Sequence, residues 1–267
     1  MYYVIYPIFE GLFSVSFQPE LPDLTFENIH SFVFLVLGED GEAILVDTGF
    51  PTQDVRGTTF SFHKTPQQDI LVALQQHGLA AADIPYIVQT HLHWDHTANM
   101  QRFTHASFYV QAEEFRSLLQ LNPNEETYYS PSNWMPLLNR IHLIEGSQEI
   151  KPGLRLFLTG GHTPGHQVLE VNTRSGPVIL GGDLPFNYDQ LWKMVPEQFW
   201  TWYRNGPGKK YYWDPQTFKS IENWLRTSGH YERPAIEKMD YQAVKKSGKR
   251  LILSHDPRLL KIPRIPE

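Results

Sequence analysis

Thr90–His96, with the sequence THLHWDH, is the stretch that decides the fold of this chain. It directly follows the apolar run Tyr86–Val88, which is short enough to be a buried strand. Imidazole nitrogens and carboxylate oxygens suit zinc and similar divalent ions. The stretch supplies four such side chains: His91, His93, Asp95 and His96. The sequence therefore predicts a strand that ends at a metal site.

The composition restricts how that metal can be held. The chain has 267 residues, of which 41% are hydrophobic, and this is enough to bury a sizeable core. No shift in composition forces a boundary, so we expect one domain over residues 1–267. There are no cysteines, which excludes disulfides, thiolate ligands and a thiol nucleophile. Histidine and carboxylate side chains must therefore supply the ligands.

Charge and hydropathy point to a small-molecule substrate as the partner. The N-terminal run MYYVIYPIFEGLF has no basic region and is interrupted by Pro7, Glu10 and Gly11, unlike a signal peptide. No stretch approaches the ~18 apolar residues of a membrane span, so we expect a cytoplasmic protein without a membrane partner. The net charge of -6, without a dense tract of lysine and arginine, argues against a nucleic-acid partner. The oligomeric state is left open.

The rest of the chain alternates between apolar runs and amphipathic segments. We expect strands in residues 2–17, 30–37, 43–46, 86–89, 107–110, 141–145, 154–158, 168–171, 178–180 and 250–253. We expect helices in residues 66–78, 112–121 and 214–226. Thr65 should cap the first helix, with Pro66 at its first position and Gly78 at its end. The proline-rich tail after residue 256 suggests no further element.

Polar groups follow the ends of five predicted strands: Asp47, the stretch 91–96, His162, Asp183 and His255. Alternating strands and helices with reactive groups at the strand ends are typical of a layered sheet that presents a site at one edge. We therefore expect these groups to meet.

These motifs together resemble the metallo-β-lactamase fold superfamily, and within it the N-acyl-homoserine-lactone lactonase-like branch. The matching pieces, in chain order, are ILVDTG at 44–49, THLHWDH at 90–96, GHTPGH at 161–166, GGD at 181–183 and SHD at 254–256. The resemblance implies an α+β fold, a four-layer αββα sandwich. It also implies two divalent metal ions, with zinc expected and manganese or iron as alternatives.

The resemblance also implies which residues hold each ion. One ion would be held by His91, His93 and His162, and the other by Asp95, His96 and His255, with Asp183 between the two. Asp95 is also predicted to be catalytic. A hydroxide shared by two divalent ions is the expected nucleophile, because such ions bring the pKa of bound water from ~15.7 to ~7.

Four further residues are predicted to lie around the ions. Asp47 is expected to orient a ligand histidine or its loop, and His166 to pack beside the ligands. Lactonases of this type have a tyrosine three residues after the bridging aspartate; this chain has Phe186 there and Tyr188 two residues later, both predicted to line the substrate pocket. The aromatic-rich segment 186–224 is either a lid over the metals or ordinary core packing.

The sequence leaves three hypotheses for the function, of which two are hydrolytic enzymes. The leading hypothesis is the opening of a lactone or related cyclic ester by a dinuclear centre. The second is thioester hydrolysis of the glyoxalase II kind, which shares the same ligands. The third is a non-catalytic, metal-stabilised binding or sensor protein. His93 in place of a glutamate is unlike the di-iron flavoprotein branch and favours hydrolysis over redox chemistry.

Overall fold

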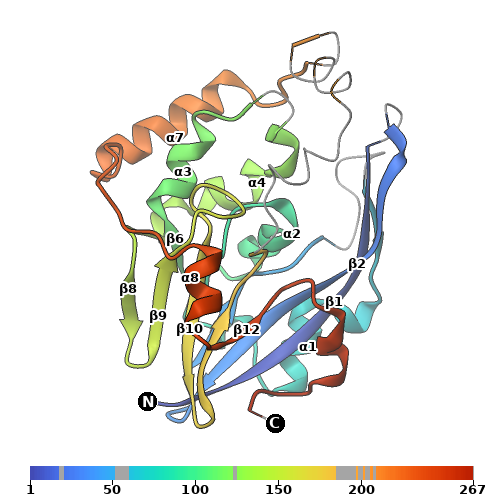
Figure 1. The fold of residues 1–267 in the computed structure, drawn as a ribbon, viewed down its shortest axis with the longest axis vertical. Coiled ribbons are helices and arrows are strands. Elements are labelled where there is room, and N and C mark those ends of the chain that lie inside the picture. The colour runs from blue at the N-terminus through green and yellow to red at the C-terminus, as the bar shows by residue number, and fades with distance from the viewer. Residues whose placement is uncertain are drawn as a thin grey trace.

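The computed structural model describes residues 1–17, 21–51, 60–122, 125–184, 197, 201, 205–206 and 209–266. Phe186 and Tyr188 lie outside the described residues. In the described part, two β-sheets pack face to face and helices cover their outer faces (Figure 1). This is the predicted four-layer αββα arrangement.

The first sheet has seven strands in the order β4-β1-β2-β3-β5-β6-β7 among the described residues. Their bounds are β1 Tyr3–Phe17, β2 Leu21–Gly38, β3 Ala43–Val46, β4 Phe60–His63, β5 Tyr86–Val88, β6 Ser107–Gln111 and β7 Ile141–Ile144. Strands β3, β5, β6 and β7 run parallel to one another, and β1, β2 and β4 pair in antiparallel fashion. The parallel strands are the ones that the alternation of strands and helices predicts.

The second sheet has five strands in the order β12-β11-β10-β9-β8 within the described ranges. Their bounds are β8 Gln148–Lys151, β9 Leu154–Leu158, β10 Gln167–Thr173, β11 Gly176–Leu180 and β12 Arg250–Ile252. Strands β10 and β11, both predicted from sequence, form an antiparallel hairpin, and β12 pairs with β11 in parallel. This pairing brings the chain after residue 252 back beside the chain after residue 180.

Three buried clusters account for the layers. Between the sheets, Ile5, Phe34 and Val46 of the first sheet pack against Leu156 and Leu180 of the second. On the outer face of the first sheet lie α1 (Ile70–Gln76), α3 (Ala112–Leu118), α4 (Pro131–Trp134) and α7 (Pro215–Thr227). On the outer face of the second sheet lies α8 (Tyr241–Lys246). No helix in the described part of the chain is both long and apolar enough to cross a bilayer.

The first predicted helix is wrong at its start. Pro66–Gln68 forms a separate 3-10 turn after Thr65, and α1 begins only at Ile70. Asp69 has an extended backbone, and its carboxylate accepts a hydrogen bond from the Leu71 amide at 3.0 Å, so it is the N-cap of the α-helix. The predicted stop is confirmed, because Gly78 has a φ of +75° that favours glycine.

The C-terminal tail is more ordered than its prolines suggested. Asp256 caps a 3-10 turn at Pro257–Lys261 by accepting a hydrogen bond from the Arg258 amide at 2.9 Å. Ile265 is fully buried and exchanges two backbone hydrogen bonds of 2.7 Å with Ile5 of β1. The expectation of no further element is therefore wrong. Both ends of the chain lie at the edge of the molecule that is lowest in Figure 1.

Candidate metal centre

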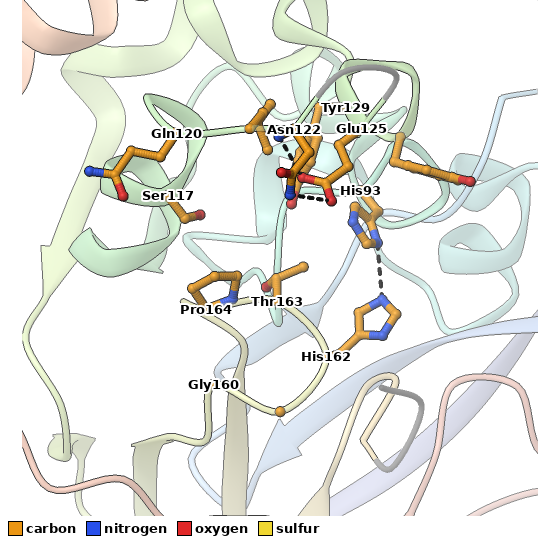
Figure 2. Close-up of a pocket in the computed structure, with 13 residues that line it drawn as sticks. His93, Ser117, Gln120, Asn122, Glu125, Tyr129, Gly160, His162, Thr163 and Pro164 are labelled. Carbon is orange, nitrogen blue, oxygen red and sulfur yellow. Dashed lines mark hydrogen bonds between the residues drawn. The ribbon is translucent and has the colours of Figure 1, made fainter. Parts of the chain in front are cut away.

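Three histidines from two loops meet at the end of the sheets. His91 and His93 follow β5, and His162 follows β9. Nδ1 of His93 lies 3.0 Å from Nε2 of His91 and 3.0 Å from Nε2 of His162, a contact drawn in Figure 2. These three side chains could hold a metal ion. The sequence predicted the same set.

A second group lies beside the first. Asp95 and His96 belong to α2 (Trp94–Thr97), whereas Asp183 and His255 follow β11 and β12. Nε2 of His96 is 3.4 Å from Oδ2 of Asp95, and Nε2 of His255 is 3.6 Å from the same oxygen. All four could hold a second ion.

Asp183 lies between the two groups. Its Oδ1 is 3.2 Å from Nε2 of His96 and 3.1 Å from Nε2 of His255, while its Oδ2 is 3.5 Å from Nε2 of His162. Oδ2 also lies 3.2 Å from Nε2 of His255, so the Asp183 carboxylate contacts histidines of both groups. This is the position that a carboxylate shared by two ions requires.

The geometry fits metal ions better than hydrogen bonds. Nε2 of His96 and Oδ1 of Asp183 are buried, and neither has a hydrogen-bond partner among the described residues although they lie 3.2 Å apart. Buried polar atoms are normally paired. Ligand atoms that converge on a cation are the exception, because they satisfy their lone pairs at the ion.

The electrostatics of the two groups differ. Burial and the neighbouring imidazoles hold the pKa of His91 and His93 well below the ordinary range, so both rings are neutral and can ligate. Burial alone would lower the pKa of His96, but Asp183, Asp95 and Asp47 raise it well above the ordinary value. Because a ligand imidazole must be neutral, ion binding at the second group should be accompanied by release of any proton that these carboxylates favour on His96.

Asp47 contacts His96 of the second group at the ring nitrogen Nδ1. It follows β3 with a φ of +63°. Its Oδ1 accepts a hydrogen bond from the Thr90 amide at 2.7 Å, and its Oδ2 accepts one from the Thr90 hydroxyl at 2.9 Å and lies 2.8 Å from Nδ1 of His96. This contact leaves Nε2 of His96 directed at the site. It is the arrangement expected of a residue that orients a ligand histidine.

Replacing Asp47 with asparagine is expected to weaken metal binding by about 10- to 100-fold. One carboxylate oxygen becomes an NH2 group, so either Thr90 or His96 loses an acceptor. Competition against a chelator of known affinity measures the change, and Asp40→Asn on the exposed turn after β2 is the control. Equal affinities for the two variants would contradict this account of Asp47.

Glu114 is a site residue that the sequence did not reveal. This carboxylate on α3 is fully buried. Its Oε1 accepts a hydrogen bond from the Leu92 amide at 2.9 Å, and its Oε2 accepts from the Thr163 hydroxyl at 2.5 Å and the Gly165 amide at 3.2 Å. Burial raises its pKa to about 7 against these hydrogen bonds, which lower it. Glu114 therefore joins the loop of His91 and His93 to the loop of His162.

Gly165 lets that second loop approach α3. A Cβ added at this glycine would lie 2.0 Å from the Glu114 backbone nitrogen and 2.3 Å from its Cα. Gly165→Ala should therefore destabilise the fold by about 1–3 kcal/mol, the usual range for overpacking. Urea denaturation measures the loss. A loss below about 0.5 kcal/mol would contradict the packing argument.

Of the remaining predicted residues, the structure describes His166 but not Phe186 or Tyr188. His166 is fully buried beside the ligands: its Nδ1 lies 2.6 Å from the Thr159 hydroxyl and its ring centroid 5.5 Å from that of His91. Burial and His162 lower its pKa to about 3. It is not among the two groups that could hold an ion. Phe186 and Tyr188 lie outside the described residues, so their place in the pocket stays a prediction.

Part of the aromatic segment packs in the core. The ring centroid of Trp224 lies 4.8 Å from that of Phe115, and Trp213 contacts Trp134 and Phe218. The buried carboxylate of Glu126 accepts hydrogen bonds from the amides of Tyr212 and Trp213. For Trp213 and Trp224, core packing is the better interpretation. A lid over the metals stays a prediction for the rest of the segment.

Known proteins are similar to this chain in sequence. An N-acyl homoserine lactonase from Bacillus thuringiensis is 34% identical over 180 residues, which cover 63% of this chain and 69% of the relative. A Bacillus cereus N-acyl homoserine lactonase is 33% identical over the same length.

Solved structures agree. The Bacillus thuringiensis protein AiiA, in a mutant form with N-decanoyl-L-homoserine bound at the active site, aligns with a TM-score of 0.64 and 26% identity over 98% of this chain and 96% of that one. An N-acyl homoserine lactone hydrolase with its product N-hexanoyl-L-homoserine at the catalytic metal centre aligns with the same values. A family model of the metallo-beta-lactamase superfamily matches residues 27–221, and the chain belongs to that superfamily.

Proposed function

We propose that this protein is a dinuclear metal-dependent hydrolase that opens a lactone or a related cyclic ester. The observation that carries the proposal is Asp183, whose carboxylate lies within 3.5 Å of histidines from two adjacent groups of candidate metal ligands. The similarity to N-acyl homoserine lactonases supports the choice of bond. The net charge of -6 continues to argue against a nucleic-acid partner.

Each of the two groups would hold one ion, and Asp183 would be shared between the two ions. The groups contain seven side chains in all. Imidazole and carboxylate ligands without cysteine suit zinc, and manganese or iron would also be accepted. Two such ions supply an activated water and a Lewis acid for the ester carbonyl. An ion held by the three imidazoles of the first group would keep a position free for water, as hydrolytic sites require.

Asp95 is the residue that we assign to proton transfer. Its carboxylate is only 8% exposed, and Oδ2 lies within 3.6 Å of both His96 Nε2 and His255 Nε2. Hydrolysis adds water across the ring C–O bond, so the attacking water loses a proton and the leaving alkoxide gains one. Asp95 would hold that proton in between on the carboxylate oxygen that the ion does not engage.

The experiment is a panel of lactones offered to metal-loaded protein, with thioesters in parallel. We expect ring opening of at least one lactone, measured through the proton that the acid product releases. We expect His91→Ala to lose that activity. Activity on thioesters alone would replace the proposal with the second hypothesis. Stoichiometric metal binding without hydrolysis of either class would indicate a binding protein instead.

A further inference from the structure

Glu10 and Gly11 interrupt the apolar N-terminal run, and the structure gives this interruption a place. The register of β1 against β2 shifts between Phe9 and Gly11, so Glu10 is the extra residue of a β-bulge. Gly11 follows it with a φ of +119°, which favours glycine. Bulges re-aim a side chain and are frequent next to active sites. At this bulge the Glu10 side chain is fully buried.

Lys64, directly after β4, is the partner of the Glu10 carboxylate. Its Nζ forms an ion pair with Oε2 of Glu10, and the two side chains are only 1% and 0% exposed. The same Nζ donates a hydrogen bond to the Phe50 carbonyl at 3.1 Å and lies 4.7 Å from the centroid of the Phe50 ring. Oε1 of Glu10 has no hydrogen-bond partner among the described residues. The ion pair is therefore buried but only partly satisfied.

Stability alone does not explain such a pair. Two charges lose their water when they are buried, and apolar side chains of similar volume are often as stable or more stable in their place. Burial raises the pKa of Glu10 to about 7 although Lys64 acts to lower it, so the fold holds this carboxylate less favourably than water does. Apolar side chains could not supply the donor that Lys64 directs at the Phe50 carbonyl.

The carbonyl that Lys64 contacts belongs to loop 48–50, which is fastened to α2 and the residue after it. The Thr48 amide donates a hydrogen bond to the His96 carbonyl at 2.8 Å. The Ala98 amide donates one to the Gly49 carbonyl at 3.1 Å. Because α2 carries a carboxylate and an imidazole of the second metal group, the position of this loop bears directly on that group.

Glu10 packs against the same loop. A Cβ added at Gly49 would lie 2.2 Å from Oε2 and 2.6 Å from Cδ of Glu10. Glu10 thus fills the space beside the loop while Lys64 holds its carbonyl. The first metal group has a different support, since Glu114 accepts a hydrogen bond from the Leu92 amide between two of its histidines. The ion pair should therefore act on the second group more than on the first.

We propose that Glu10 and Lys64 are a positioning pair for the second metal group: they fix loop 48–50 and, through it, the α2 residues that would hold the ion. The inference rests on the proposed function, because it concerns the same dinuclear centre. Both residues act through the loop, so they are positioning residues and not catalytic residues.

The test replaces the pair with two apolar side chains of similar length, in Glu10→Leu/Lys64→Met. Zinc affinity is measured by competition with a chelator in two backgrounds: His162→Ala, which leaves the second group complete, and His255→Ala, which leaves the first group complete. We expect zinc binding to weaken by about tenfold in the His162→Ala background, the lower end of the range for residues that support ligands. It should be unchanged in the His255→Ala background.

Urea denaturation of the metal-free protein separates positioning from folding. The unfolding free energy should change little, because a buried ion pair replaced as a whole is often neutral for stability. If the apolar pair does not fold, Glu10→Gln/Lys64→Met takes its place, since glutamine retains the size of Glu10 and the donor of Lys64 is still lost. The same two zinc affinities then decide.

Glu42→Leu/Lys151→Met is the matched control. Glu42 and Lys151 form an ion pair of 2.7 Å with side chains that are also largely covered. Glu42 precedes β3, whereas loop 48–50 follows that strand by way of Asp47, so this pair lies at the other end of β3. Its replacement should leave zinc affinity unchanged in both backgrounds.

Unchanged zinc affinity in Glu10→Leu/Lys64→Met would overturn the positioning role, and an equal loss at both groups would show that the pair only stabilises the fold. Neither measurement uses a lactone, so the proposed function fails separately. If only the second group loses affinity and the unsubstituted protein opens no lactone, the ring-opening function is wrong and the positioning role holds. If lactones are opened and zinc affinity is unchanged, the positioning role is wrong and the function stands.

Discussion

Replacing Asp183 with asparagine is expected to lower kcat/KM on any substrate of this centre by about 100-fold or more. Residues that only support metal ligands typically contribute 10- to 100-fold, and Asp183 faces both groups directly. The substitution removes one negative charge from between His96, His255 and His162. Since that charge offsets the charge of both cations, we also expect fewer bound ions per chain, measured by elemental analysis after gel filtration.

The size of Asp183 is retained in asparagine, so a fall in activity will not reflect a cavity. Circular dichroism should show an unchanged fold. Asp214→Asn is the matched control, because Asp214 caps α7 by accepting a hydrogen bond from the Gln216 amide, and asparagine caps helices equally well. Full metal content and full activity in Asp183→Asn would show that Asp183 is not shared by two ions.

The candidate ligands were predictable from sequence because each follows a strand in a short local motif. His91 and His93 come directly after an apolar run that is long enough to be a strand, and His255 follows another. Polar groups at strand ends suggested that these loops would gather, and the family resemblance supplied their division between two ions. The αββα fold was predicted from family resemblance, whereas periodicity gave only its alternating elements.

The supports of the site were not predictable, because they depend on contacts between distant segments. Glu114 lies in the first turn of a helix, where an acidic residue usually interacts with the helix dipole at the surface. Only the tertiary structure shows that it is buried and meets Leu92 and Gly165. A cavity of about 290 Å³ beside His93 and His162 is likewise lined in part by residues that carry no motif, such as Ser117. Asp69 was missed for a local reason, since Thr65 and Pro66 gave an equally good helix start.

Glu114→Leu is expected to reduce the free energy of unfolding by about 3 kcal/mol or more. The leucine fills the space but leaves the Leu92 amide, the Gly165 amide and the Thr163 hydroxyl without their acceptor, and each unpaired buried donor costs about 1–3 kcal/mol. Urea denaturation measures the loss. Glu149→Leu on the exposed strand β8 is the control. A loss below 1 kcal/mol would mean that water replaces the carboxylate.

The charge of Glu114 should also make the stability depend on pH. Its pKa is about 7 in the folded protein and 4.5 in the unfolded chain, so the folded state binds more protons between these values. Stability from this group is complete below pH 4.5 and is lost as the pH rises to about 7, by roughly 3 kcal/mol in total. Glu114→Gln cannot ionise, so its unfolding free energy should lack that part of the slope. The measurement is the unfolding free energy against pH for the unsubstituted protein and for Glu114→Gln, with a chelator present. Parallel curves would show that Glu114 is ionised throughout and that its three hydrogen bonds stabilise the charge.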